Sequence, residues 1–299
     1  WDAPVSGDIE SLSAALLASI PALVNYVRTA GYAAAGDRGG ALYKRVVSEP
    51  AHAGKFQSAD GAWWELVEPT VTPEMFGAIP TMDTYAGGFT AGNADTAANT
   101  TAFGKMISFV TATAAEIFLP GVYYVGNIRP LSPIVIRGLG IEKSGLVYDV
   151  DENGAVLLSF STNDVNPFGS VFEDMFMYFS YGRDISNNLD AVRLRETGSN
   201  RNVTFRRVLI ENFSRYGIRA SDTFNCIFED LRLRRCGSPS LEKGAGLFLN
   251  NITFSGNTAT TGNVIKNIYA SGCYRGIEAR GDAYLQQFEQ VYAESCTVG

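Results

Sequence analysis

The sequence predicts a mainly β protein built as a parallel β-helix, a solenoid of stacked coils. Two observations support this prediction: a phrase that returns at a period in the low twenties, and a strand-like alternation inside it. The phrase occurs at 203–213, 226–236, 263–273 and 286–296, with an earlier copy at 170–180. A fixed period with variable loops is typical of repeats that bury their apolar faces only against neighbouring repeats.

Each late copy contains a Phe or Ile that we take as position 0. The interval is 23 residues from Phe205 to Phe228, and again from Ile265 to Phe288. Positions +3, +5 and +8 are apolar or small, and the positions between them are mostly charged or polar. This alternation has the period of strands and excludes helical repeats, while the Leu and Asn ladder of leucine-rich repeats is missing. Parallel coils stacked about 4.8 Å apart remain.

Position +8 carries three of the four cysteines, Cys236, Cys273 and Cys296. Because equivalent positions stack, we expect an inward-facing ladder of thiols, and cysteine buries readily as a small hydrophobe. A disulfide or a metal site is the alternative. Three cysteines in one column without a nearby His make a poor zinc site.

The N-terminal third is expected to hold three elements before the coils begin. Apolar residues at helical spacing between 8 and 29, with Pro21 opening a second short helix, predict a helical neck over 1–30. Its apolar stripe suits a core, an oligomer seam or virion attachment. Residues 31–70 predict a small Gly-rich β segment with strands in ALYKRV and WWELV. The β-helix is assigned to 71–299, with a capping helix over about 93–114.

Composition limits the function classes. The formal net charge of −7 argues against a general nucleic-acid binder. No apolar run approaches about 18 residues, so no membrane insertion is expected, and no secretory signal is visible. The chain starts at Trp1 and stops directly after the last copy of the phrase. We therefore expect that the native β-helix continues and is truncated at its C-terminal end.

Several phrases, in order, resemble phage tailspike and tail-fibre proteins with a pectate-lyase-like right-handed β-helix. They are GYAAAGDRGGALYKRV, FQSADGAWWELVEPTVTPEMFGA, a helix rich in Asp, Thr and Ala, IFLPGVYYV and IRGLG. The family uses similar wording: a Gly-rich turn, an ADG-W-L strand, an FGA entry, a helix introduced by DDT and an LPxGxY first coil. This chain departs from it in a longer link, IPTMDTYAGGFTAGNADT, before the helix.

The resemblance implies a homotrimeric receptor-binding spike in the virion tail, acting outside the host cell. Its partners would be host surface polysaccharide (capsule, exopolysaccharide or lipopolysaccharide) and phage tail or adaptor proteins, with no cofactor and no metal. The implied activity is polysaccharide depolymerisation, by a glycoside hydrolase or a lyase mechanism. Two alternatives stay open: a non-catalytic structural or adhesive part of a tail fibre, and a free polysaccharide lyase or epimerase.

Arginines are concentrated in one stretch of this acidic chain. Residues 189–235 contain ten Arg, no Lys and six acids, so the stretch is locally about +4. A band of Arg suits acidic saccharides because the guanidinium group binds carboxylates with two hydrogen bonds. The other interpretation is that these arginines are outward side chains paired with neighbouring acids.

Catalytic candidates come from carboxylates at equivalent positions of different coils. Asp222 and Asp282 both lie 17 residues after a position 0, in coils separated by one other. Stacking alone would set them roughly 9.6 Å apart, which approaches the separation used by inverting glycosidases. Glu173, Glu229 and Glu289 share position +1, which indicates an outward ion-pair ladder, and Asp174 and Asp230 share position +2.

A lyase would instead need a base near a cation that neutralises a carboxylate. Arg219, Arg280 and Tyr274 are the candidates for this role and for substrate binding. The single histidine, His52, precedes the coils and is expected at the surface or in a turn. A His-centred triad within the β-helix is therefore excluded.

Overall fold

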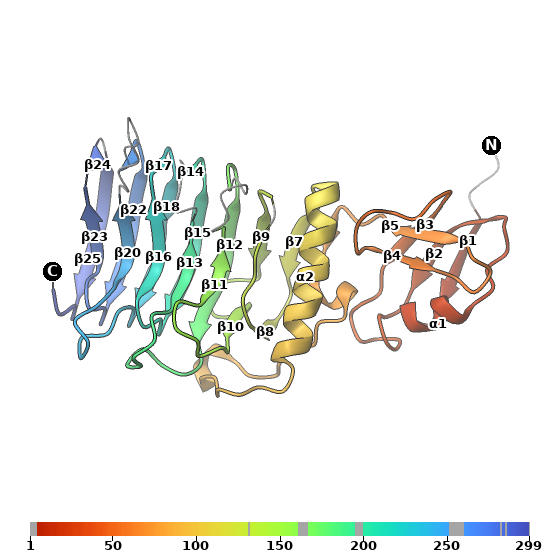
Figure 1. Ribbon diagram of the computed structural model, residues 1–299, viewed down its shortest axis with the longest axis horizontal. Coiled ribbons are helices and arrows are strands. Elements are labelled where there is room, and N and C mark those ends of the chain that lie inside the picture. The colour runs from red at the N-terminus through yellow and green to blue at the C-terminus, as the bar shows by residue number, and fades with distance from the viewer. Residues whose placement is uncertain are drawn as a thin grey trace. The chain divides into compact units, whose positions relative to one another are not determined.

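The structure is a computed structural model that describes residues 5–130, 132–160, 167–194, 200–250, 260–281, 283–284 and 286–298. The chain divides into two compact units. The N-terminal unit comprises Trp1–Pro80 and Ala98–Phe118, and the β-helix unit comprises Thr81–Ala97 and Leu119–Gly299. Figure 1 labels most of the helices and strands of both units.

The N-terminal unit contains a five-stranded sheet in the order β1-β2-β3-β5-β4. The strands are β1 (Val5–Ile9), β2 (Val24–Thr29), β3 (Leu42–Val46), β4 (Lys55–Gln57) and β5 (Trp63–Leu66). Strands β3 and β5 confirm the two strands predicted in ALYKRV and WWELV. Burial alternates along β5, where Trp64 and Leu66 are buried and Trp63 and Glu65 are partly exposed, as expected for a sheet with one covered face.

The predicted helical neck over 1–30 is wrong outside Leu12–Leu17, because strands β1 and β2 form on either side of the helix. Helix α1 (Leu12–Leu17) begins after Ser11, whose hydroxyl accepts the Ala14 N–H at 3.1 Å. The chain then turns at Pro21 and enters strand β2, which pairs with β1 in parallel and with β3 in antiparallel. Hydrogen bonding to strands on both sides stabilises β2 as a strand. The helical spacing of its apolar residues gives so short a segment only a weak preference for helix.

The rest of the N-terminal unit is mainly helical. It holds the short strand β6 (Thr70–Val71), the 3-10 helix η1 (Pro73–Phe76), helix α2 (Thr96–Thr113), whose first two residues group with the β-helix unit, and most of β7 (Glu116–Leu119). Helix α2 confirms the helix predicted over 93–114, and its capping role stays a prediction. Its Phe109 ring lies 5.1 Å from the His52 ring. His52 is in a bend, as expected, but it is buried and its Nε2 lies 2.9 Å from a Glu65 oxygen.

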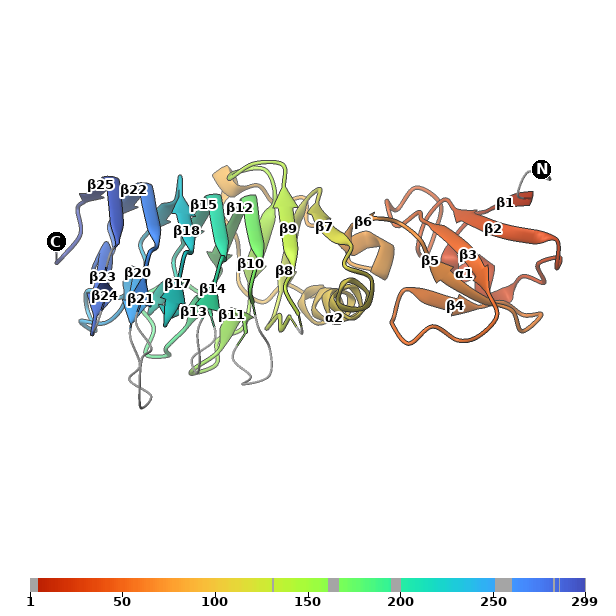
Figure 2. The ribbon, with the colours of Figure 1, turned by 90° about the horizontal axis from the view of Figure 1, so that it is seen from above.

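The described residues of the β-helix unit form three parallel sheets, which confirms the predicted fold class (Figures 1 and 2). Sheet 1 contains β8 (Val122–Val125), β9 (Val135–Gly138), β10 (Gly145–Tyr148), β12 (Val171–Phe179), β15 (Thr204–Glu211), β18 (Ile227–Glu229), β19 (Arg232–Arg234), β22 (Val264–Ser271) and β25 (Gln287–Glu294). Sheet 2 contains β11 (Val156–Ser159), β13 (Asp190–Arg193), β16 (Tyr216–Ser221), β20 (Ala245–Asn250) and β23 (Ile277–Arg280). Sheet 3 contains β14 (Asn200–Arg201), β17 (Thr223–Phe224), β21 (Thr260–Thr261) and β24 (Ala283–Tyr284). A 3-10 turn, η2 (Tyr85–Gly87), precedes them.

The register confirms the repeat read from the sequence. Position 0 forms one continuous column of paired residues: Ile136, Phe172, Phe205, Phe228, Ile265 and Phe288. The Phe172 and Phe205 rings stack at 4.7 Å, and those of Phe205 and Phe228 at 5.8 Å. Because each ring packs on the ring of the next coil, the ladder stabilises the stack in addition to burying apolar area.

The cysteines at position +8 form the expected ladder. Cys236 and Cys273 are fully buried, Cys296 is half-buried, and all are free thiols. Each sulfur contacts a carbonyl oxygen of the preceding coil, at Ile210, Leu233 and Ala270. The contact with Cys236, together with burial, raises the pKa of the Cys273 thiol. These cysteines therefore behave as small core residues.

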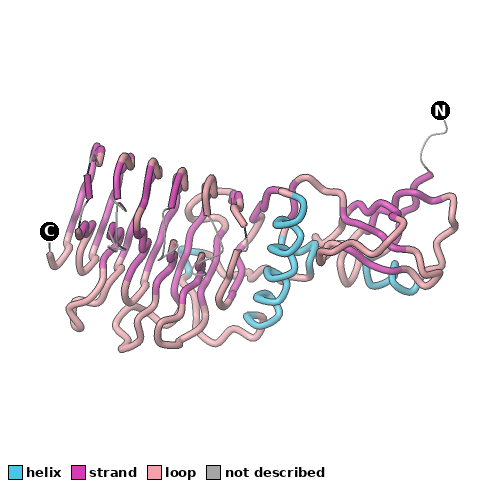
Figure 3. Tube along the Cα trace, turned by 45° about the horizontal axis from the view of Figure 1, so that its top comes forward, coloured by secondary structure: helices cyan, strands magenta, loops and turns pink. Residues whose placement is uncertain are grey.

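Residues with left-handed backbone conformation form the corners of the coils, and they recur at fixed positions of the repeat. At position +2, Asp174, Arg207, Asp230, Asn267 and Gln290 have φ between 51° and 56°. Asn202, Asn225 and Gly262 at position −3, and Asn212, Arg235, Gly272 and Ser295 at position +7, also have positive φ. Each such residue bends the strand and separates its hydrogen-bonded segments. In Figure 3 strands form the walls of the coils and loops join them.

Candidate functional site

Position +1, at the start of the sheet 1 strands, carries side chains of alternating charge from one coil to the next. The paired residues are, in order, Arg137, Glu173, Arg206, Glu229, Lys266 and Glu289. Arg206 contacts Glu173 at 3.0 Å and Glu229 at 2.8 Å. The ion-pair ladder predicted at this position is confirmed, and its acids are occupied by structural pairing.

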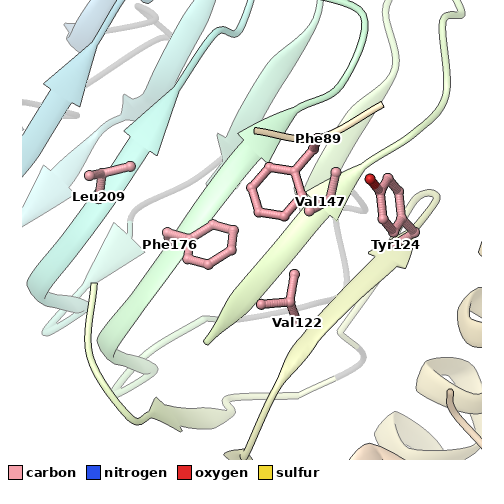
Figure 4. Close-up of a cluster of buried hydrophobic side chains, with 6 residues drawn as sticks. All are labelled: Phe89, Val122, Tyr124, Val147, Phe176 and Leu209. Carbon is pink, nitrogen blue, oxygen red and sulfur yellow. The ribbon is translucent and has the colours of Figure 1, made fainter. Parts of the chain in front are cut away.

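Along position +4, the outer face of sheet 1 changes from buried apolar side chains to arginine and tyrosine. Val122, Phe176 and Leu209 of the early coils are buried, and the column continues, in register, to Arg232, Tyr269 and Tyr292. The early half is covered by residues 81–97, which we call the covering segment. Figure 4 shows the ring of Phe89, from this segment, beside Val147 and Phe176; the Phe89 and Phe176 rings stack at 5.4 Å.

A buried carboxylate ties the covering segment to the coils. The hydroxyl of Tyr85 donates to Glu211, and Arg235 donates to the same carboxylate through Nε at 2.9 Å. Arg234 in turn donates to the Tyr85 oxygen at 3.0 Å. Burial and the contact with Glu211 raise the pKa of Tyr85. The edge of the covering segment is therefore held by a charged network on the coil that carries β19.

A groove of about 790 Å³ opens on sheet 1 where apolar residues give way to Arg and Tyr at position +4. Its polar walls come from successive coils and include Asp174, Arg207, Asp230, Arg232, Arg234 and Tyr269. Ile141 adds an apolar edge. A concave surface with convergent polar groups and an aromatic ring is the usual form of a ligand site.

The two acids of the groove occupy corner position +2. Arg207 holds Asp174 with two hydrogen bonds, at 2.6 and 2.8 Å. These bonds lower the pKa of Asp174. Asp230 accepts a hydrogen bond from the amide of Asn267 on the next coil. Because Arg207 stands in register between them, the backbone positions of the two acids are two coil steps apart, roughly 9.6 Å by stacking.

The other groove residues have fewer internal contacts. Arg232 has an ion pair with Glu142 at 3.7 Å, and both side chains are about half exposed. Tyr269 is 37% exposed and donates to Glu294. The groove is thus lined by guanidinium groups and by a partly exposed tyrosine.

The stretch of ten arginines is mostly ion-paired. Described pairs join Arg193 and Arg215 to Asp190, Arg206 to Glu173 and Glu229, Arg207 to Asp174, Arg232 to Glu142 and Arg235 to Glu211. The interpretation as outward side chains paired with neighbouring acids therefore accounts for most of the band. Arg195 lies outside the described residues.

The predicted catalytic pair is not assembled by the described residues. Asp222 is fully buried at a left-handed corner after β16, with φ of 48°, so its side chain does not face a surface polymer. Asp282 lies outside the described residues. Ser221 aligns with Arg280 through Asn250, and Phe224 aligns with Tyr284 through Thr261, so the corner between these positions has one residue more in the later coil. The proposed separation of Asp222 and Asp282 stays a prediction.

The three predicted binding residues lie outside the groove lining, Arg219 and Arg280 on strands of sheet 2 and Tyr274 before strand β23. Arg280 is exposed and contacts Glu278, which also lies 3.6 Å from Arg275. Arg275 in turn lies 4.3 Å over the ring of Tyr274, which is buried. Arg219 is half-buried and pairs through its backbone with Phe248. Their role in substrate binding stays a prediction.

Sequence reasoning missed the groove as a site although it noted Asp174 and Asp230. The available signal was position +4, where Leu209 is followed in the next copies by Arg232, Tyr269 and Tyr292. The described residues contain no group of three or more His, Cys, Asp or Glu arranged to hold a metal ion. In the same ranges, no helix is both long and apolar enough to cross a membrane.

No family model matches the chain, and no curated protein matches it by sequence. Solved structures do resemble it. A Pantoea stewartii glycan biofilm modifying enzyme with a tailspike-like parallel β-helix aligns with a TM-score of 0.69 at 15% identity, over 97% of this chain and 42% of the enzyme. The tailspike gp49 of Acinetobacter baumannii bacteriophage Fri1, a capsular polysaccharide depolymerase, aligns at 0.57 and 15% identity, over 98% and 60%.

A third structure, tailspike protein 2 of an Escherichia coli bacteriophage, aligns with a TM-score of 0.56 at 14% identity, over 91% of this chain and 42% of that protein. At these identities the comparison shows a shared fold: the chain has the parallel β-helix of phage tailspikes and of a tailspike-like enzyme. It spans about half the length of the proteins that it resembles.

Proposed function

We propose that this chain is the β-helical part of a phage tailspike that binds a bacterial surface polysaccharide in the groove on sheet 1. The observation that carries the proposal is the change along position +4, where the covered Leu209 is followed by Arg232 and Tyr269. Charged and aromatic side chains there project from rigid strands. The structures that it resembles include a capsular polysaccharide depolymerase and a glycan-modifying enzyme.

Cleavage is the second part of the proposal, and Asp174 and Asp230 are its candidate pair. Their spacing of two coil steps lies close to the upper end of the range used by inverting glycosidases. The lowered pKa of Asp174, caused by the hydrogen bonds from Arg207, keeps it a carboxylate suited to activate water. Asp230 would then protonate the leaving oxygen.

A non-catalytic adhesin is the competing proposal, and the same contacts support it. Asp174 is bound by Arg207 and Asp230 by Asn267, so both acids already have structural partners. In either case we propose a homotrimer located in the virion tail and docked to tail or adaptor proteins. A monomer mass by light scattering would contradict the trimer.

The deciding experiment incubates the 299-residue protein with a panel of purified capsular and O-antigen polysaccharides. Binding is measured by calorimetry, and cleavage by chain length and reducing ends. If it cleaves, Asp174→Asn and Asp230→Asn should each lose about a hundredfold or more in rate, while Glu289→Gln, in the charge ladder, should keep it. Binding without cleavage supports the adhesin. Absence of binding to every polysaccharide contradicts the proposed function.

A further inference from the structure

We infer that the saccharide bound in the groove is acidic, and that Arg232 and Arg234 bind its carboxylate. The inference rests on the proposed function and adds the class of the substrate. It starts from strand β19, which supplies both arginines to the same groove.

The two guanidinium groups project from one side of β19. Residues two apart on a strand point to the same face and have Cα atoms about 6.6 Å apart. Leu233 between them is fully buried in the core, so Arg232 and Arg234 face outward together. Both guanidinium groups can therefore contact a carboxylate that lies over this face of β19.

Arg207, the third arginine of the groove, is already engaged. Its Nε and one terminal nitrogen hold both oxygens of Asp174, at 2.6 and 2.8 Å. A guanidinium group has five N–H donors in one plane. A carboxylate that accepts from two of them occupies the edge of the group that would otherwise bind an anion. Arg207 therefore positions Asp174 instead of binding a ligand anion.

Arg232 and Arg234 keep most of their donors available. The described contact of Arg232 with an acid is the 3.7 Å ion pair to the exposed Glu142, longer than a hydrogen bond. Arg234 uses one nitrogen for the Tyr85 oxygen at 3.0 Å. The remaining N–H groups lie in a groove whose other free charge is the single carboxylate of Asp230.

The charge of the groove lining and the position of Tyr269 both favour an acidic saccharide as the ligand. The groove lining contains three arginines and two aspartates, so it has a cationic excess after Arg207 and Asp174 neutralise each other. Tyr269 stands on the next coil in register with Arg232. A sugar ring over Tyr269 would bring a carboxyl substituent to β19, where planar guanidinium groups suit it better than a point charge would.

The test uses polysaccharides in matched forms. Acidic capsular polysaccharides, the same polymers with their carboxyl groups reduced to alcohols, and neutral O-antigens are each titrated against the protein. Binding of the acidic form with a loss of about tenfold or more on reduction is expected. Equal binding of native and reduced forms, or preference for neutral polymers, overturns the inference and leaves the proposed function standing. Binding of none contradicts both.

Variants link the effect to β19. Arg232→Gln and Arg234→Gln should each weaken binding of the acidic polymer about tenfold or more and make Kd less dependent on salt. Their affinity for the reduced polymer should change little. Arg137→Gln is the matched control, because Arg137 is a half-exposed arginine of sheet 1, paired with Glu173 and outside the groove lining. An equal loss in all three variants, or a salt dependence that stays unchanged, would overturn the assignment to β19.

Discussion

Two halves of one column on sheet 1 have opposite surroundings. At position +4, Phe176 and Leu209 are fully buried beneath the covering segment, whereas Tyr269 is 37% exposed and the Arg232 side chain is 46% exposed. Strand pairing is parallel and in register across both halves. The backbone of the coils is thus the same, and what differs is the loop that lies over it.

This difference shows how one strand face of a solenoid can provide both part of the core and a polar groove open to solvent. Where residues 81–97 cover the face, apolar side chains join the hydrophobic core. Where the cover ends, at the network of Tyr85, Glu211 and Arg234, the face carries charge. Removing the cover and changing the exposed half should therefore have separable effects on stability and on binding.

The largest expected effect is on stability in the covered half. Phe176→Ala removes a fully buried ring that stacks on Phe89, and should lower the free energy of unfolding by about 3–5 kcal/mol. Tyr292→Ala, at the equivalent position of the exposed half, should cost less than about 1 kcal/mol. Denaturant unfolding monitored by circular dichroism measures both. Equal losses would contradict the division of the face into two halves.

The next effect concerns the boundary between the halves. Glu211→Gln removes the charge that Tyr85 and Arg235 share, and should destabilise the protein by about 1–3 kcal/mol. Hydrogen exchange should then increase in residues 81–97 more than in strand β12. Glu289→Gln, a half-exposed acid of the charge ladder, is the control and should leave that exchange unchanged. Unaltered exchange in the Glu211 variant would show that the network does not fix the covering segment.

A smaller effect is expected on binding in the exposed half. Tyr269→Ala should weaken polysaccharide binding by about 1 kcal/mol, roughly fivefold in Kd, because it removes the aromatic surface of the groove. Its stability should remain near that of the original protein. Tyr181→Ala, an exposed tyrosine outside the groove lining, is the matched control. A loss of the same size in that control would place the binding surface elsewhere.

The smallest effect is the pH dependence from Asp174. Because Arg207 lowers its pKa in the folded state, Asp174 contributes stability above the unfolded pKa of about 4 and loses it as pH falls through the folded pKa. The pair is partly exposed, so we expect less than about 1 kcal/mol. Stability measured between about pH 5 and pH 2 should fall less steeply in Asp174→Asn and in Arg207→Gln. Parallel curves for all three proteins would contradict this contribution.

The inward columns could be predicted from the sequence because stacking repeats one burial environment at one position. Phe205 and Phe228, or Cys236 and Cys273, therefore carry the same kind of side chain. The covering segment could not be found in this way. Tyr85 contacts Glu211, which lies 126 residues later, and no periodicity links them.

Counting along the chain does not give the register where corners vary in length. Asp222 and Asp282 are equally spaced from position 0, but between the Ser221–Arg280 and Phe224–Tyr284 alignments the later coil has one residue more. A coil can gain or lose a residue at a corner without changing its strands. The charged ladder at position +1 does not depend on corner length, because it lies next to position 0 within one strand segment.

The left-handed corner at position +2 has a consequence for how such a surface can diversify. Its backbone bends in the same way whether the residue is Asp174, Arg207 or Asn267, and the side chain leaves the coil toward the groove. Substitutions there alter the groove one coil at a time while the buried rings at position 0 remain packed. Under the proposed function, a change of preferred polymer could therefore come from the exchange of a few corner residues, without a change in the packed coils.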